Sequence, residues 1–186
     1  YDIMSEKDEQ RYSDPDAAGL NALGLTRHPF VNFYNCKNVK FIGRGMIDLS
    51  HLDRRERRGV VFTKCKNIEM RGMKIVNAPE WSIISYLNEN IEIKDVDIFG
   101  YRQNSDGFAI CNTHDGLIER CFARTGDDLF SVKALGAPDP APSENITFTD
   151  CVGWGGKARC YGITGEVNKP IRNITFKDSA VICRDA

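Results

Sequence analysis

The sequence lacks a strong net charge, a long apolar run and closely spaced cysteines. Its 25 Lys and Arg nearly balance 26 Asp and Glu, for a formal net charge of −1, which gives no electrostatic reason to expect nucleic acid or a membrane surface as a partner. No apolar run approaches the ~18–20 residues needed to cross a bilayer. With 41% hydrophobic residues among 186, the chain can still bury the core of one domain.

The seven cysteines include no C-x-x-C pair, a spacing typical of zinc sites. We therefore expect no metal site, and no other cofactor is indicated. The three histidines are scattered along the chain and predict no shared site. No segment shows a convincing helical period, which leaves strands as the expected elements.

One short pattern recurs six times in the sequence. Most copies read Asn or Asp, an aliphatic residue, a polar residue and an apolar residue, and the copies start at residues 38, 67, 90, 115, 145 and 173. The starts are 29, 23, 25, 30 and 28 residues apart. Self-similarity at such a spacing, with period-2 alternation inside each copy, is typical of a β-solenoid.

These observations predict an all-β fold, a right-handed parallel β-helix of about six to seven coils. The helix is expected over residues 31–186, with the polar residues 1–30 as a cap or connecting segment. The charged stretch at residues 53–58 is expected to project as a loop. Because the first residue is Tyr1 and the repeats reach the last residues, we expect a piece of a longer protein, truncated at the C-terminal end of the helix.

Equivalent positions in successive coils of a solenoid stack on one another. The repeat asparagines are therefore expected to form a ladder at one corner, so we discount the glycosylation sequons at Asn145 and Asn173. Four cysteines also recur at fixed offsets from the repeat Asn or Asp, and we expect small apolar interior positions for them, with disulfides between stacked neighbours as the lesser alternative: Cys36, Cys65, Cys121 and Cys151.

Two aligned segments carry the candidate chemistry, Asn104–Ile110 and Gly126–Val132, which start 22 residues apart, about one coil. Their alignment sets Asp106 against Asp128, with Asp127 alongside. Crowded carboxylates repel, so one of them can hold a proton and act as a general acid while the others activate water, as in inverting glycoside hydrolysis. The alternative is that these aspartates are turn residues in a solvated loop.

Five further residues are candidates for substrate binding. The register places Arg159 beside Asp128, where it favours the ionised carboxylate and can bind an anionic or hydroxyl-rich sugar. Lys133 can reach the same patch or be an ordinary exposed lysine, and Glu166 is a weaker candidate. Trp81 lies one coil before Asp106, with an alignment ambiguous by two residues, and either stacks on a sugar or packs structurally. Asn104 begins the first aspartate segment.

The chain resembles the polygalacturonase-like glycoside hydrolases, the pectinase group of right-handed parallel β-helix enzymes. The resemblance runs over about residues 57–178. Asn104–Gly107 is similar to the family's Asn-Thr-Asp-Gly segment and Thr125–Asp128 to its Gly-Asp-Asp segment, while Arg57–Phe62 and Pro79–Trp81 also fall where the family has similar segments.

The resemblance implies an inverting hydrolase, secreted or periplasmic, that acts on a polysaccharide or oligosaccharide. It implies that Asp127 is the general acid and that Asp106 and Asp128 activate the attacking water. Two departures weaken an expectation of galacturonate specificity: Ala158–Cys160 stands where the family has Gly-His-Gly, so that Arg159 replaces the histidine, and the family's Arg-Ile-Lys segment would fall past Ala186.

Two other functions stay open at this point. A calcium-dependent polysaccharide lyase would use aspartates to hold the cation and Arg159 as base. A non-catalytic, sugar-binding β-helix, such as a tailspike or adhesin segment, would bind without turnover. The sequence leaves open the sugar, the linkage, the exo or endo mode and the oligomeric state.

Overall fold

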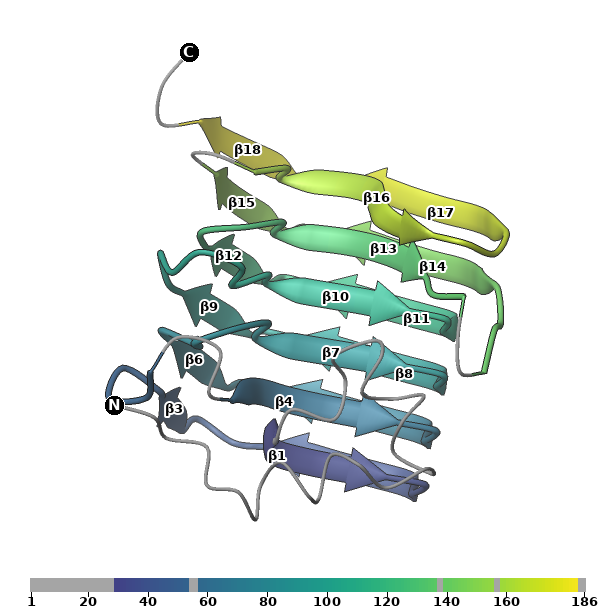
Figure 1. Cartoon of the computed structure of the whole chain (residues 1–186), viewed down its shortest axis with the longest axis horizontal. Coiled ribbons are helices and arrows are strands. Elements are labelled where there is room, and N and C mark those ends of the chain that lie inside the picture. Colours follow the sequence, from purple (N-terminus) through teal and green to yellow (C-terminus); the bar gives the residue numbers. More distant parts are fainter. Residues whose placement is uncertain (1–28, 54–56, 137–138, 156–157, 184–186) are drawn as a thin grey trace, which may run out of the picture.

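The computed structural model describes residues 29–53, 57–136, 139–155 and 158–183, and all regular structure in these ranges is β. Figure 1 shows the strands stacked in successive coils along one axis. The described ranges hold no helix long and apolar enough to span a membrane. Their strands are β1 (Pro29–Tyr34), β2 (Lys37–Ile42), β3 (Met46–Asp48), β4 (Arg58–Thr63), β5 (Lys66–Arg71), β6 (Lys74–Val76), β7 (Ile83–Tyr86), β8 (Glu89–Lys94), β9 (Asp97–Phe99), β10 (Phe108–Cys111), β11 (His114–Glu119), β12 (Phe122–Arg124), β13 (Phe130–Ala134), β14 (Ser143–Thr149), β15 (Val152–Gly155), β16 (Tyr161–Val167), β17 (Ile171–Lys177) and β18 (Ala180–Cys183).

Each coil contributes one strand to each of three parallel sheets. The first sheet runs β1-β4-β7-β10-β13-β16, the second β2-β5-β8-β11-β14-β17 and the third β3-β6-β9-β12-β15-β18, six strands in each. The predicted right-handed parallel β-helix is confirmed. Its first strand begins at Pro29, two residues before the predicted start of the helix. The predicted cap falls almost wholly on residues outside the described ranges and stays a prediction.

The repeat Asn or Asp lies near the start of each strand in the second sheet and has a positive φ of 53–60°. Asn and Asp adopt this left-handed conformation more readily than other non-glycine residues. The amide of Asn67 donates to Asn38 at 2.9 Å and that of Asn90 to Asn67 at 3.0 Å. Asn145 donates to Asp115, and Asn173 to Asn145, both at 2.9 Å. Both sequon amides are therefore engaged in the ladder.

The interior is filled by side chains that stack from coil to coil. Phe108, Phe130 and Tyr161 form one such column, with ring centroids 5.0 and 4.9 Å apart and nearly parallel planes. These separations match the spacing between adjacent strands of a sheet. Cys121 and Cys151 are buried in the same core, as predicted, and the thiols are free.

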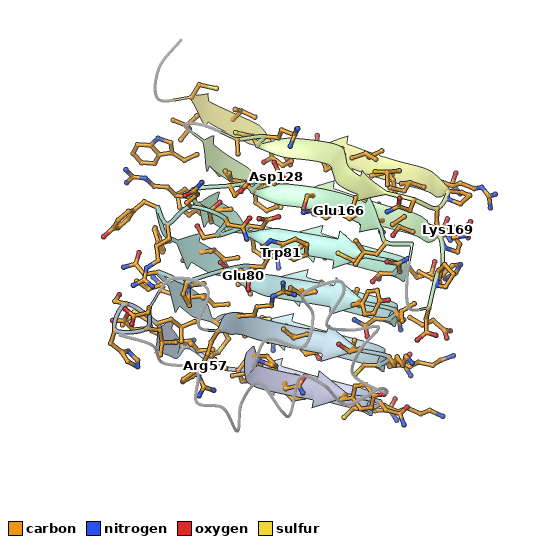
Figure 2. All side chains as sticks on the ribbon, in the orientation of Figure 1. Arg57, Glu80, Trp81, Asp128, Glu166 and Lys169 are labelled. Atoms are coloured by element: carbon orange, nitrogen blue, oxygen red, sulfur yellow. The ribbon has the colours of Figure 1, made fainter. Side chains whose placement is uncertain are left out.

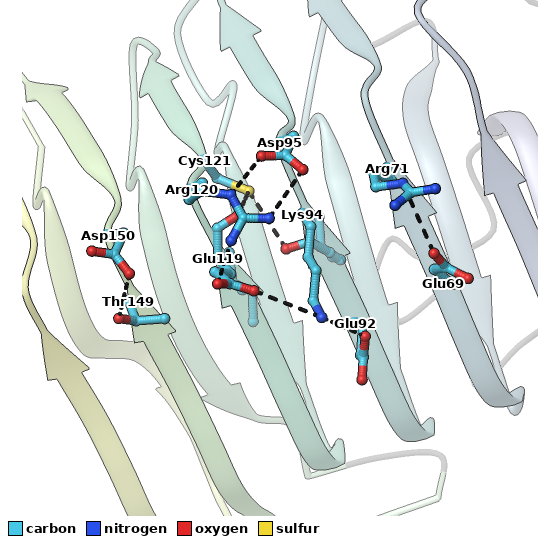
Figure 3. Close-up of polar contacts among 12 residues, drawn as sticks. Glu69, Arg71, Glu92, Lys94, Asp95, Glu119, Arg120, Cys121, Thr149 and Asp150 are labelled. Carbon is cyan, nitrogen blue, oxygen red and sulfur yellow. Dashed lines mark hydrogen bonds and ion pairs between the residues drawn. The ribbon is translucent and has the colours of Figure 1, made fainter.

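The outward face of the second sheet and the turns that follow its strands carry several ion pairs (Figure 3). Lys94 lies 2.7 Å from Glu92 and 3.7 Å from Glu119, while Arg120 pairs with Asp95 at 2.7 Å. Exposed pairs of this kind contribute little to stability, typically about 0–1 kcal/mol each. The buried columns of the interior therefore stabilise the helix, whereas the charged side chains of this face contact solvent.

The asparagine ladder is interrupted between Asn90 and Asp115, because the Asp115 side chain has no amide N–H to donate to Asn90. Replacing Asp115→Asn supplies that donor, while the exposed contact of the Asp115 carboxylate with His114 Nδ1 is lost. We expect the free energy of unfolding to rise by about 0.5–1 kcal/mol. Urea denaturation measures it. The mirror-image control, Asn67→Asp, removes the donor to Asn38 and should lower the same quantity; a change of equal sign in both variants would contradict the ladder.

Candidate active site

One column of residues lies just before the strands of the first sheet. Phe108 pairs in register with Ile83 on one side and Phe130 on the other, and Phe130 pairs with Tyr161. Two residues before each of these strand positions stand four of the predicted site residues: Trp81, Asp106, Asp128 and Arg159. The predicted stacking is confirmed, and the ambiguous alignment of Trp81 is resolved in favour of direct register with Asp106.

Backbone hydrogen bonds hold this column together. The N–H of Ser82 donates to the carbonyl of Asp106 at 2.8 Å, that of Gly107 to Asp128 at 2.8 Å, and that of Leu129 to Arg159 at 2.9 Å. A side chain at Gly107 would collide with the carbonyl oxygen of Leu129 in the next coil. The glycine that follows Asp106 is therefore required for the close approach of the two aspartate turns.

Asp106 is the most enclosed of the three carboxyls, with 3% of its side chain exposed. Its Oδ2 accepts a hydrogen bond from Lys133 Nζ at 2.9 Å. Burial raises the pKa of Asp106 from 3.8 to about 7, opposed by the charge and hydrogen bond of Lys133 and reinforced by the negative charges of Asp127 and Asp128.

Asp128 and Asp127 are linked through the backbone of their own turn. The N–H of Asp128 donates to Asp127 Oδ1 at 2.9 Å, and the Thr125 hydroxyl donates to the Asp127 carbonyl at 3.0 Å. Asp128 is buried, and its Oδ1 accepts bonds at 3.3 Å from both the backbone N–H and Nη1 of Arg159. Asp127 is only half-buried. The predicted neighbour relation between Arg159 and Asp128 is confirmed.

Trp81, Asp128 and Glu166 lie on the same face of the helix (Figure 2). Lys133 Nζ lies 3.2 Å from Glu166 and 4.0 Å from the centroid of the Trp81 ring. Trp81 is 7% exposed and the Lys133 side chain 4%. Both were candidates for substrate binding, with structural packing as the alternative for Trp81 and an ordinary exposed lysine as the alternative for Lys133. Their burial leaves almost no surface for a ligand, and the alternative of an exposed lysine is wrong.

A buried ion pair that was not predicted from the sequence lies next to this column. Arg58 donates through Nε and Nη2 to Glu80 at 3.2 and 3.3 Å, and its guanidinium carbon lies 5.1 Å from the Trp81 centroid. Arg58 was expected in a projecting loop, but it is the first residue of β4 and is buried. Arg58 and Glu80 are 22 residues apart, the same spacing that predicted the stacking of Asp106 on Asp128. That spacing could have predicted the ion pair. Asn104 reaches Glu80 at 3.5 Å, at the limit of a hydrogen bond.

No group of three or more His, Cys, Asp or Glu within the described ranges is arranged to hold a metal ion. The column thus holds two buried aspartates in register, Asp106 and Asp128, with Asp127 on the adjoining turn.

The family model for glycosyl hydrolases family 28 matches residues 30–185 of the chain. The chain belongs to this family. The resemblance inferred from the two aspartate segments is thereby confirmed. A search of curated proteins found no match.

Several solved structures share the fold of this family 28 chain. The polygalacturonase from Erwinia carotovora ssp. carotovora superposes with a TM-score of 0.72 at 18% identity, over 83% of this chain and 46% of its own length. A hyperthermoactive exopolygalacturonase from Thermotoga maritima is 27% identical, with a TM-score of 0.55 over 66% of this chain and 29% of its own. A family 28 exopolygalacturonase from Yersinia enterocolitica gives 0.59 at 13%, over 79% and 37%. The chain thus spans less than half of each of these relatives.

The raised pKa of Asp106 predicts a pH-dependent stability. The folded state binds this proton more tightly than the unfolded chain, so the contribution is complete below about pH 4 and is lost as pH rises through about 7. Asp106→Asn cannot ionise, and its unfolding free energy relative to the wild type should improve between pH 4 and 8. A rise from 3.8 to about 7, at about 1.4 kcal/mol per pH unit, sets an upper limit of about 4 kcal/mol.

Thermal unfolding at closely spaced pH values measures this difference. Asp95→Asn is the control, because Arg120 holds the pKa of Asp95 below its ordinary value (Figure 3). The stability from that pair is present at neutral pH and lost in acid, so Asp95→Asn should change in the opposite direction. Parallel curves for wild type and Asp106→Asn would rule out a proton bound at Asp106.

Proposed function

We propose that this chain carries the catalytic aspartates of a polysaccharide-cleaving glycoside hydrolase with an inverting acid/base mechanism. One observation carries the proposal: Asp106 and Asp128 stack in register, with Asp127 on the adjoining turn. Family membership supports the same conclusion. In an inverting mechanism one carboxylic acid protonates the leaving oxygen while a carboxylate on the other side activates water.

Asp127 is the proposed general acid, and Asp106 and Asp128 together activate the water. The carboxyl with the raised pKa is Asp106, which by proton affinity alone would be the acid. Its access argues against that role, because its side chain is 3% exposed and its Oδ2 is held by Lys133. Asp127 is half-buried and on the same turn, so its carboxyl is the one that a glycosidic oxygen can approach.

A raised pKa suits Asp106 to the base side of the reaction. A carboxylate with a pKa of about 7 is a stronger base than an ordinary aspartate, and it is half ionised at neutral pH. Asp128, bonded to Arg159, supplies a second acceptor for the same water. The rate should therefore depend on ionisation of Asp106 and rise as pH approaches neutrality.

The proposed substrate is a pectin-like or other acidic polysaccharide. The relatives from Erwinia, Thermotoga and Yersinia are named polygalacturonases or exopolygalacturonases. Arg159, with 62% of its side chain exposed, is the cation of the column that a sugar carboxylate can reach. Glu166, half exposed beside Lys133, and Asn104 would bind sugar hydroxyls at the rim.

Incubation of the chain with a panel of polysaccharides tests the activity. We expect new reducing ends without absorbance from unsaturated products, with and without EDTA. Asp127→Asn should lower the rate by about 10²–10⁴-fold, the usual loss of a general acid. Asp97→Asn, at a half-buried aspartate paired with Lys74 in the third sheet, is the matched control and should leave the rate unchanged.

Each outcome of that assay separates one function from another. Metal-dependent absorbance would identify a lyase, and binding without any product would identify a sugar-binding β-helix. NMR of the first product, before mutarotation, tests inversion: retention of the anomeric configuration would contradict the mechanism proposed here.

Leaving-group dependence tests the division of roles. An aryl glycoside with a very acidic phenol needs no protonation of its leaving oxygen. On such a substrate Asp127→Asn should recover at least about tenfold relative to the polysaccharide, whereas Asp106→Asn and Asp128→Asn should not. Recovery in Asp106→Asn instead would make Asp106 the acid. The kinetics of all variants are compared with the same substrate pair.

A further inference from the structure

Lys133 lies in the fifth strand of the first sheet, and its ammonium group is surrounded on several sides. Asp106 Oδ2 lies 2.9 Å from Nζ, Glu166 Oε2 lies 3.2 Å away and the Trp81 centroid 4.0 Å away. Only 4% of the side chain is exposed. The ammonium donates a hydrogen bond to Asp106 Oδ2, forms an ion pair with Glu166 and lies over the π face of the Trp81 ring.

We propose that Lys133 is a positioning residue that holds Asp106 in place and keeps it able to ionise, with Trp81 as the platform that fixes the ammonium. Its function is exerted through Asp106, not through contact with the sugar. The catalytic part of this inference rests on the proposed hydrolase function. The coupling of Lys133 to Asp106 does not depend on it.

Asp106 requires such a partner because its surroundings disfavour its charge. Desolvation and the nearby carboxylates of Asp127 and Asp128 all raise the pKa of Asp106, and Lys133 is the cation that lowers it. Without an ammonium at hydrogen-bonding distance, a carboxyl this enclosed would stay protonated well above neutral pH. A protonated Asp106 cannot accept a proton from water.

Trp81, at the end of the column opposite Arg159, contacts the Lys133 ammonium with its ring. The indole is itself packed against the Arg58 guanidinium, which is fixed by its two hydrogen bonds to Glu80. Cation–π contacts gain strength when both groups are removed from water, as they are here. This arrangement explains why a tryptophan in register with Asp106 is buried and not open to a sugar ring.

The other titratable groups around Lys133 either stay neutral or favour its charged form. Cys111 pairs with it in register, and burial raises the pKa of that thiol to about 12, so it stays neutral. Asp106 and Glu166 provide negative charge and raise the pKa of Lys133 in spite of its burial. A permanently charged lysine can therefore act on Asp106 over the whole range in which Asp106 titrates.

Titration of the Asp106 carboxyl is the direct test. Its ¹³C resonance is the one missing from the spectrum of Asp106→Asn. Lys133→Met, which removes the charge but keeps an unbranched chain, should raise the midpoint by about one to three pH units. Lys133→Arg should restore most of the difference. Lys64→Met, which removes a half-exposed lysine paired with Asp139 at 2.7 Å, is the control and should leave the midpoint unchanged. An unshifted midpoint in Lys133→Met overturns the proposal.

The pH profile distinguishes positioning from sugar binding. In Lys133→Met the acidic limb of kcat/KM should move upward with the Asp106 midpoint, while KM at the new optimum changes less than about threefold. An unmoved limb with KM raised at least about tenfold would make Lys133 a sugar ligand and overturn the proposal. If no substrate is cleaved, the carboxyl titration still decides the coupling, so failure of the hydrolase function is recognised separately.

A second pair of variants serves if Lys133→Met does not fold. Trp81→Phe keeps a π face under the ammonium, whereas Trp81→Leu keeps only apolar bulk. The Asp106 midpoint should rise in Trp81→Leu and stay near the wild-type value in Trp81→Phe. Equal midpoints in both would show that the ring does not hold Lys133 and would overturn the assignment of Trp81.

Discussion

Each coil of this helix hydrogen-bonds in register to the coils on either side, so that residues one coil apart become neighbours at about 4.8 Å. The backbone bonds that follow Asp106 and Asp128 are members of that same ladder. The constraint leaves little freedom: a glycine must stand at Gly107 because the next coil's carbonyl occupies the space of a side chain. Stacked rings in the interior and stacked asparagines at the corner hold the register from both sides of the backbone.

The same register places like charges in adjacent coils, and each of the two enclosed aspartates is paired with a cation. Asp106 and Asp128 stand in adjacent coils, with Arg159 beyond Asp128 and Lys133 reaching back to Asp106. Taking these carboxylates out of water is costly unless each meets a cation and hydrogen bonds. Such pairs add little net stability, but loss of the cation disfavours the ionised form of the carboxyl that it accompanies. The positions of the two aspartates are therefore fixed by these cations as well as by the backbone register.

Sequence alone predicted whatever depends on the backbone register. The repeat gave the coils, and the 22-residue alignment gave the contact between Asp106 and Asp128, because stacking equates positions. The direction of long side chains is set by packing, which the register does not contain. The sequence therefore left Lys133 and Trp81 open between sugar contact and other positions, and it placed Arg58 in a loop. In the structure Lys133 and Arg58 both pack against the Trp81 ring. The predicted cap and the roles of the site residues stay predictions.

Proton affinity within the cluster follows burial first and crowding second. The sequence predicted a raised pKa from repulsion among the three carboxyls, but for Asp106 desolvation is the larger cause of the raised pKa, and the charges of Asp127 and Asp128 add to it. Consequently the carboxyl that holds a proton most tightly is the most enclosed one, which a substrate oxygen reaches least easily. Acid and base roles in such a column must then be divided by access as well as by pKa, and the half-buried Asp127 is the carboxyl that combines proximity with access.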